Sequence, residues 1–303
     1  MKLRSFLTLT SLLAAACGDD GGTTPAMPDA PRDIGFTKPT AALKANKETA
    51  PNTWTELGPA DLSCLGMPAS DLPTTVAVAL TTKVRDFQSN NPVPNAAVTV
   101  FRDQDVGSPV DTKTADGNAD VTVTIPVGTK RFGFKMTEAS ALDTLLLNQR
   151  VEPGQMAQML PAIQSVSKTT ATLLPALIGS MRTAGTGVLA GAMYDCQRRE
   201  ISNFIATVSS TRGSVTHLAG ADTYYFLPDV GLPAKHNQHA SATSDGLFMV
   251  IELAAAPAAF VQVWGYPTDA DLAGDNLKLI AELPTPVISD TVITGSLEPL
   301  RTP

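Results

Sequence analysis

The feature that most constrains the fold of this chain is an internal repeat. Residues 84–100 and 194–208 share one pattern, in which an Asp ends an apolar run, an Asn follows, and Thr-Val closes a second apolar run. Further along, each copy carries Thr-x-Asp-Gly, first at 114–117 and again at 243–246. Self-similarity on the scale of a domain indicates related structural units. The sequence therefore predicts two modules of one fold.

The length of the chain agrees with this division, and its charge limits the partners. A chain of 303 residues with 43% hydrophobic content is long enough for about two domains. The formal net charge is −7, and Lys and Arg form no cluster in the sequence. Nucleic-acid and anionic-membrane surfaces require basic patches. We therefore expect no nucleic-acid partner.

The N-terminal residues have the pattern of a bacterial lipoprotein signal peptide at 1–17. Lys2 and Arg4 precede an apolar stretch at 6–16, which is followed by Cys17. The stretch is too short for a permanent transmembrane helix. Leu-Ala-Ala-Ala-Cys resembles a lipobox, with the Leu one position further from the Cys than usual. We expect lipidation of Cys17 and a membrane anchor, with a plain secretory signal as the alternative.

The residue after Cys17 bears on where such a lipoprotein resides. Gly18 stands there, whereas Asp at this position retains lipoproteins at the inner membrane. By resemblance to sorted lipoproteins, we expect the bacterial outer membrane or the cell surface.

Two cysteines remain once Cys17 is assigned to lipid, Cys64 and Cys196. An even remainder in an exported protein indicates a disulfide. Such a bond would tie the segment ahead of the first module to the start of the second. It would close a loop of roughly 130 residues and restrict the unfolded chain. The alternative is a pair of unpaired buried thiols.

Composition and periodicity divide the part of the chain before the second module. Residues 18–50 are rich in Gly, Thr, Pro, Ala and Asp and have no apolar period, which predicts a disordered tether. Residues 51–155 form the first sandwich with an N-terminal extension at 51–73 that we expect to lack regular structure. In this module, period-two alternation as at 121–125 marks half-buried strands.

Residues 156–186 change character, and we expect them to form a helical linker. Methionines and leucines, beginning with Met156 and Met159, recur there at steps of three and four residues. Pro175 falls near the expected start of the helix, where proline is tolerated. Core packing between the modules explains this stripe better than the alternative, a partner-binding groove.

The predicted fold is therefore all-β, with two tandem antiparallel β-sandwiches joined by the helical linker. The second sandwich covers residues 187–303. From the repeated Asn to the Thr of Thr-x-Asp-Gly there are 19 residues in the first copy and 40 in the second. An insertion at about 209–240 accounts for the difference. It contains His217, Tyr224, Tyr225, His236 and His239.

Insertions between strands often carry the function of a sandwich, because the scaffold leaves their sequence free. Tyr224, Tyr225, His236 and His239 could therefore contact a glycan or a protein, although we expect at least one of the two tyrosines in the core. A weaker hypothesis is a metal site built from His217, His236 and His239, with Asp222 or Asp229 as further ligands. Surface histidines are the simpler explanation.

Catalytic patterns are missing from the sequence. It contains no Gly-x-Ser-x-Gly, no His-Glu-x-x-His and no glycine-rich phosphate loop. We therefore expect no catalytic residues and no cofactor.

The turn and strand motifs resemble a known family. The first copy contains Pro-Val-Pro-Asn-Ala-Ala-Val-Thr-Val, then Thr-Ala-Asp-Gly-Asn, and Ile-Pro-Val-Gly before Phe-Gly-Phe-Lys. These motifs are similar to those of the carboxypeptidase regulatory-like domain, which is a transthyretin-like, Ig-like β-sandwich. The resemblance covers 74–151 and 187–301, with Thr-Ser-Asp-Gly-Leu-Phe-Met-Val as its clearest part in the second copy. It implies an accessory role in binding, spacing or stabilisation and transfers no catalytic residues.

The expected function is therefore that of a non-enzymatic, membrane-anchored envelope lipoprotein that binds or scaffolds glycan or protein partners. The alternative is a metal-dependent enzyme with a His/Tyr site in the 209–240 insertion. Intradiol ring-cleavage dioxygenases have a related sandwich and hold iron with two Tyr and two His. In that family the histidines follow the Asp-Gly turn, whereas His236 and His239 precede Asp245 and are spaced differently.

Overall fold

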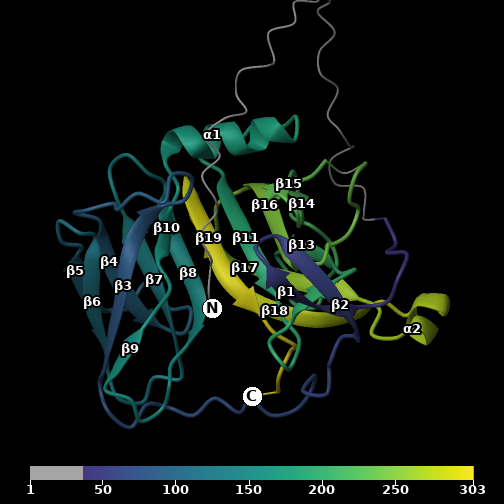
Figure 1. Ribbon diagram of the computed structural model, residues 1–303, viewed down its shortest axis with the longest axis horizontal. Coiled ribbons are helices and arrows are strands. Elements are labelled where there is room, and N and C mark those ends of the chain that lie inside the picture. The colour runs from purple at the N-terminus through teal and green to yellow at the C-terminus, as the bar shows by residue number, and fades with distance from the viewer. Residues whose placement is uncertain (1–36, 236, 303) are drawn as a thin grey trace, which may run out of the picture.

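Most of the regular structure in the described part of the chain is β-strand, as its alternating apolar residues predict (Figure 1). The computed structural model describes residues 37–235 and 237–302. These contain nineteen strands and two helices. The prediction of an all-β fold built from two sandwiches is therefore confirmed.

The first module is a two-layered sandwich of eight strands. One layer contains β3, β6, β9 and β10, and the other contains β4, β5, β7 and β8. The bounds are β3 (Val78–Asp86), β4 (Ala97–Arg102), β5 (Pro109–Thr114), β6 (Asp120–Ile125), β7 (Arg131–Thr137), β8 (Asp143–Arg150), β9 (Ala157–Met159) and β10 (Ile163–Ser165).

The second module repeats the pairing plan of the first. Strands β11, β16 and β19 correspond to β3, β6 and β10, because β3–β6 and β11–β16 pair antiparallel while β3–β10 and β11–β19 pair parallel. Strands β13, β17 and β18 correspond in the same way to β4, β7 and β8. The bounds are β11 (Gly187–Met193), β12 (Glu200–Ser202), β13 (Ile205–Ser209), β16 (Leu247–Leu253), β17 (Ala256–Gly265), α2 (Asp269–Ala273), β18 (Lys278–Val287) and β19 (Thr291–Leu297).

One layer of each module joins a common sheet through the parallel pairing of β8 with β19. Asp143 lies opposite Thr291, and Leu147 lies opposite Gly295. The result is a nine-stranded sheet that runs through both modules, and β19 lies beside β8 at its centre (Figure 1). The expectation of purely antiparallel sandwiches is wrong at this pair, at β11–β19, and where β9 and β10 pair with β3.

The two hydrophobic cores lie on opposite faces of this sheet. Along β8, Leu145 and Leu147 belong to the core that β13, β17 and β18 cover. Leu146 packs instead against the core of the first module. Because successive side chains of a strand point to opposite faces, the outer layers of the two modules cover the sheet from opposite sides.

The repeated Asn and Asp residues occupy equivalent turns. Asn95 and Asn203 have φ values of 62° and 67°, in the left-handed region that Asn tolerates better than most residues. The Oδ1 of Asp86 accepts the backbone N–H of the residue three positions later in the chain, at 2.8 Å. The Oδ1 of Asp195 accepts the N–H four positions on at 2.9 Å. The motif that marks the repeat in the sequence is therefore structural.

The N-terminal segment is more ordered than its composition predicts. Strands β1 (Lys44–Ala50) and β2 (Thr53–Pro59) form a hairpin, and β1 pairs with β12 of the second module. Leu43 and Ala45 are 1% and 0% exposed. The predicted disorder is therefore wrong for 44–50, and the expected irregular structure is wrong for the residues of β2. The hairpin has few apolar residues, so its stability depends on β12 rather than on a pattern of its own.

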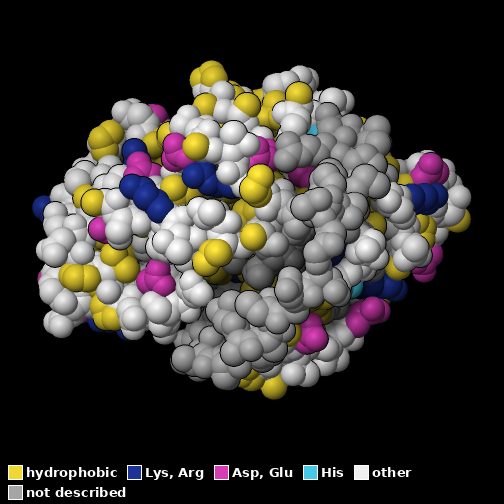
Figure 2. Space-filling model, turned by 90° about the horizontal axis from the view of Figure 1, so that it is seen from above, with side chains coloured by type: hydrophobic (Ala, Val, Ile, Leu, Met, Phe, Trp, Pro, Cys, Tyr) yellow, Lys and Arg dark blue, Asp and Glu magenta, His cyan; other side chains and the backbone are white. Residues whose placement is uncertain are grey.

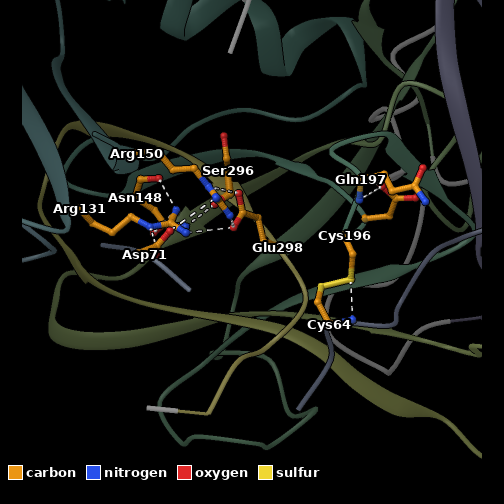
Figure 3. Close-up of polar contacts among 10 residues, drawn as sticks. Cys64, Asp71, Arg131, Asn148, Arg150, Cys196, Gln197, Ser296 and Glu298 are labelled. Carbon is orange, nitrogen blue, oxygen red and sulfur yellow. Dashed lines mark hydrogen bonds and ion pairs between the residues drawn. A yellow bond between two sulfur atoms is a disulfide. The ribbon is translucent and has the colours of Figure 1, made fainter. Parts of the chain in front are cut away.

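The predicted disulfide between Cys64 and Cys196 is present (Figure 3). It joins the segment after β2 to the turn between β11 and β12, and the two cysteines are 132 positions apart. The whole first module lies inside the loop that this bond closes. Closing a loop of this length stabilises the fold by roughly 4 to 5 kcal/mol in the chain-entropy model.

Only part of the predicted linker at 156–186 is helical. Helix α1 (Lys168–Leu177) begins after Ser167, whose Oγ accepts a backbone N–H of the first turn at 3.0 Å. Met156 precedes β9 and Met159 lies in it, and these side chains are 75% and 77% exposed. The helical prediction is wrong for them because a spacing of three residues also occurs around a short strand.

Helix α1 lies across one end of the nine-stranded sheet (Figure 1). Ala171 and Ile178 are buried beneath it. Pro175, expected near the start of the helix, lies in its last turn. Met181 and Leu173 are 80% and 54% exposed, so the predicted stripe is not a continuous core. Figure 2 shows this face of the molecule, where small groups of apolar side chains lie among basic and acidic ones.

Four charged side chains join the two modules near the ends of β8 and β19 (Figure 3). Arg131 donates from Nε to Asp71 Oδ2 at 2.7 Å and from Nη2 to Glu298 Oε2 at 3.1 Å. Arg150 donates from Nε to Glu298 Oε1 at 3.0 Å. Burial opposes ionisation of Glu298, but its hydrogen bonds to Arg150 and the charges of both arginines outweigh burial and lower its pKa. Charges this far from water need such partners.

We predict that Glu298→Gln lowers the free energy of unfolding by about 2 kcal/mol, because the mostly buried Arg131 and the partly exposed Arg150 lose their shared carboxylate. Urea denaturation at neutral pH measures this. Because the pKa of Glu298 is lowered in the folded state, its contribution is present above the unfolded pKa and is lost as pH falls through the folded one. The difference from wild type should therefore shrink in acid.

The matched control is Asp143→Asn, which removes the more exposed ion pair of Asp143 with Lys135. It should change the unfolding free energy by less than about 1 kcal/mol. Equal effects of the two substitutions would contradict a special role for the network.

Candidate functional site

The insertion at 209–240 adds two strands to the second module rather than forming only a loop. Strand β14 (Asp222–Leu227) pairs antiparallel with β16, and the short β15 (Leu232–Pro233) pairs with β14. Together they extend the nine-stranded sheet at one edge. In the first module, the additional strand β5 pairs with β4 instead, in the layer that corresponds to β13, β17 and β18 of the second module. The insertion therefore widens the shared sheet of the second module.

Tyr224 and Tyr225 lie in β14 and are buried, at 4% and 3% exposure. The Tyr225 hydroxyl accepts the backbone N–H of Ala206 at 3.1 Å. The Tyr224 hydroxyl donates to Asp222 Oδ2 at 2.6 Å. Burial raises the pKa of Tyr225 well above its usual range. Both rings are enclosed, which leaves no ring face for a glycan or protein partner.

His217 closes the outer edge of β13. Its Nδ1 accepts the backbone N–H of Val208 at 3.2 Å, and its Nε2 lies 2.8 Å from Thr223 Oγ1. Since that hydroxyl donates its own proton to Ala206 O at 3.0 Å, Nε2 carries the imidazole proton. Both ring nitrogens are therefore used, and the ring takes the place of a neighbouring strand.

The other two histidines of the insertion are His236 and His239. His236 lies outside the described residues. His239 is partly buried, and its backbone N–H donates to Lys235 O at 3.2 Å. Within 37–235 and 237–302, no three His, Cys, Asp or Glu side chains come together as metal ligands. Because both ring nitrogens of His217 already make hydrogen bonds, this residue does not suit a metal site. Metal binding by His236 and His239 stays a prediction.

An apolar groove lies on the outer face of the shared sheet, at the junction of the modules. Its volume is about 180 Å³, and none of the described residues that line it is charged. The floor is the side of β8, β19, β11 and β16 that faces away from the core of the second module. Leu146, Thr294, Ala190 and Met249 lie on it, one from each strand.

Each module contributes one wall of the groove. Leu160 and Ile163, around β10, come from the first module. Phe226 and Leu232, in the inserted β14 and β15, come from the second. Helix α1 adds Ala171 and closes one end. The described part of the insertion thus does contribute to the candidate site, but through apolar side chains rather than through Tyr224, Tyr225, His217 or His239.

The groove follows from the stagger of the two outer layers. The outer layer of the first module covers one face of the shared sheet only as far as β8, and that of the second covers the opposite face. On the groove side, Val188, Ala190 and Leu247 are therefore only half-buried. In the described part of the chain, the first module around β10, α1 and the inserted strands border this surface.

One strand of the floor, β11, carries a sequence signal for this groove that the motifs do not include. In β11, Leu189 and Met193 face the core, yet Val188, Ala190 and Ala192, which point to the other face, are also apolar. A strand that is apolar on both faces predicts burial on both. Periodicity alone does not tell whether the second face meets another layer or a ligand.

The predicted lipidation site, Cys17, lies outside the described residues together with the rest of 1–36. Of the helices in the described part, neither has the length and hydrophobicity that a bilayer span requires.

Comparisons with known proteins identify no family. No family model and no curated protein matches the sequence. A shaft pilin from Lactobacillus rhamnosus GG aligns over 75% of this chain and 98% of its own, with 11% identity and a TM-score of 0.23. The Bacillus anthracis TIE protein aligns over 74% of this chain and 34% of its own, with 12% identity and a TM-score of 0.24.

The major pilin from Streptococcus pyogenes aligns over 74% of this chain and 99% of its own, with 12% identity and a TM-score of 0.19. Scores of this size do not indicate a shared fold. The fold is therefore assigned from the strand pairing itself, and the resemblance to carboxypeptidase regulatory-like domains stays a prediction.

Asp245, in the second Thr-x-Asp-Gly, is buried at 4% exposure. Its Oδ1 accepts the Leu247 N–H and the Thr243 hydroxyl, each at 3.0 Å. Burial outweighs these hydrogen bonds and raises the pKa of Asp245 to about 7. Burial also raises the pKa of Glu200. Folding therefore favours the protonated form of Asp245.

We predict that the free energy of unfolding falls as pH rises from about 4 through 7, because the unfolded state then releases the Asp245 proton before the folded state does. Asp245→Asn should reduce this fall and exceed wild type in stability by about 2 kcal/mol at pH 8. Urea titrations across this pH range measure both effects. Asp116→Asn, at the exposed equivalent turn of the first module, is the control and should leave the pH dependence unchanged.

Proposed function

We propose that this protein is a non-enzymatic lipoprotein of the bacterial cell envelope that binds an apolar ligand in the groove between its modules. The groove itself supports the proposal best. It is apolar and uncharged, and both modules build it. Concave apolar sites between structural units are common ligand sites. A glycan partner, which needs hydrogen-bonding side chains, fits this lining less well.

The lining favours binding over catalysis. Among the residues that the structure describes, its polar side chains are two threonines and two glutamines, with no carboxylate, imidazole, amine or thiol. General acid–base and nucleophilic chemistry need such groups. The metal-enzyme alternative is weakened as well, because His217, Tyr224 and Tyr225 already make hydrogen bonds in the interior.

The connection of the modules suits a binding role. The β8–β19 pairing and the Arg131–Glu298 ion pair hold the two walls of the groove in fixed relation. A preformed site loses less entropy on binding than a site that must be assembled.

The envelope location rests on the sequence, in which a charged N-terminus and an apolar stretch precede Cys17. We predict that a bacterial host fed alkyne-tagged palmitate labels the wild-type protein and leaves it in the membrane fraction. Cys17→Ala should abolish the label. Cys196→Ala, which removes a cysteine of the disulfide, should keep it. An unlabelled wild-type protein would overturn the anchor.

We predict that the purified full-length protein binds the apolar dye Nile red in the groove. Ala190→Asp places a charge on the floor, and burying an unpaired charge is strongly unfavourable, so dye affinity should fall at least about tenfold. Fluorescence titration measures the affinity, and thermal unfolding checks that the variant folds. Val110→Asp, on the exposed strand β5, is the matched control. Equal dye binding by Ala190→Asp and wild type would contradict the site.

A further inference from the structure

We infer that the groove takes one acyl chain of an envelope phospholipid, rather than a segment of peptide. This inference rests on the proposed apolar binding role and specifies its ligand. It is carried by the floor of the groove, whose backbone groups and threonine hydroxyls already have hydrogen-bond partners.

The floor of the groove offers no open backbone groups of its own. Strand β11 lies between β16 and β19, and β19 lies between β11 and β8, so these backbones are paired on both sides. Ala190, for example, has Met249 as its partner on one side and Thr294 on the other. Interior strands use their N–H and C=O groups in the ladder.

The polar side chains of the lining are also largely used. Thr294 donates to Leu145 O at 3.0 Å, and Gln149 donates to Leu147 O at 2.7 Å. Thr144 donates to Gln164 O at 3.4 Å. Three prolines, which have no N–H to offer, complete the lining at 161, 175 and 233.

A peptide and a hydrocarbon chain differ in what this lining would do to them. Every peptide residue other than proline carries an N–H and a C=O, and burying them without partners is costly. A peptide that binds by adding a strand needs an open sheet edge. The floor consists of interior strands, and the edge strands in the walls, β10 and β15, are only three and two residues long. A hydrocarbon chain has no polar group to satisfy and gains free energy from each buried methylene.

The shape of the groove fits a single chain. Ala190 and Ala192 form a low line along β11, between the larger Met249 and Leu247 on β16 and the residues of β19. From Val188 beside α1 to Ala192, four residues of strand rise about 13 Å. One leaflet of a bilayer contributes about 15 Å of hydrocarbon. The acyl chain would enter with its terminal methyl group toward α1, which closes that end of the groove.

The absence of charge in the lining favours a phospholipid over a free fatty acid as the source of this chain. A fatty acid carries a carboxylate at the end of the chain, and among residues 37–235 and 237–302 no Lys, Arg or His lines the groove to pair with it. The headgroup of a phospholipid would stay in water. The proposed anchor also places the protein next to a membrane, where phospholipids are the abundant acyl source.

The test is displacement of Nile red from the full-length protein by lysophosphatidylethanolamines of increasing chain length, below their micelle concentrations. Affinity should rise about fourfold per added methylene, and then level off once the chain outgrows the groove. Ala190→Asp should lose this dependence, and Val110→Asp should keep it.

Three results would overturn the inference: displacement that does not depend on chain length, stronger displacement by an apolar peptide, or stronger displacement by the matched free fatty acid. In each of these, Nile red still binds in the groove, so the proposed apolar site survives. Failure of the dye to bind, or to respond to Ala190→Asp, would instead remove the proposed site together with this inference.

Discussion

The parallel pairing of β8 with β19 is the contact on which the rest of the structure depends. It turns one layer of each sandwich into a single sheet, with Leu147 opposite Gly295 at its centre. Without it, the modules would be two separate sandwiches on a linker. The charged network around Glu298 lies at the same seam, where buried arginines and carboxylates tolerate little change in geometry. Hydrogen bonding and electrostatics thus fix the relative position of the modules together.

This seam also explains where the candidate site lies. The outer layer of the first module covers one face of the shared sheet, and the outer layer of the second module covers the opposite face. Each face is therefore covered over one module and less covered over the other. On one face, the first module, α1 and the inserted strands border the uncovered part and make an apolar groove. The site is therefore a property of how two copies of one fold are joined. Neither copy has it alone.

The parts of the fold that the sequence predicts are those with local causes. Asn95 and Asn203 repeat because each occupies a left-handed turn, and strand alternation follows from half-buried sheets. The even cysteine count predicted the disulfide. The β8–β19 pairing has no local signal, because it joins strands far apart in the chain. At least one of Tyr224 and Tyr225 was expected in the core, and both are buried, because they lie on opposite faces of a strand that is enclosed on both.

The disulfide has a mechanical consequence. Cys64 and Cys196 bracket the first module, so the covalent path from the N-terminal hairpin to the C-terminus runs directly across the sulfur bridge. A pulling force applied between the two ends would travel through that bridge and the second module. The strands of the first module would carry none of this load along their own backbone. The covalent path of the load therefore bypasses the first module, and tension reaches it only through noncovalent contacts such as the β8–β19 pairing.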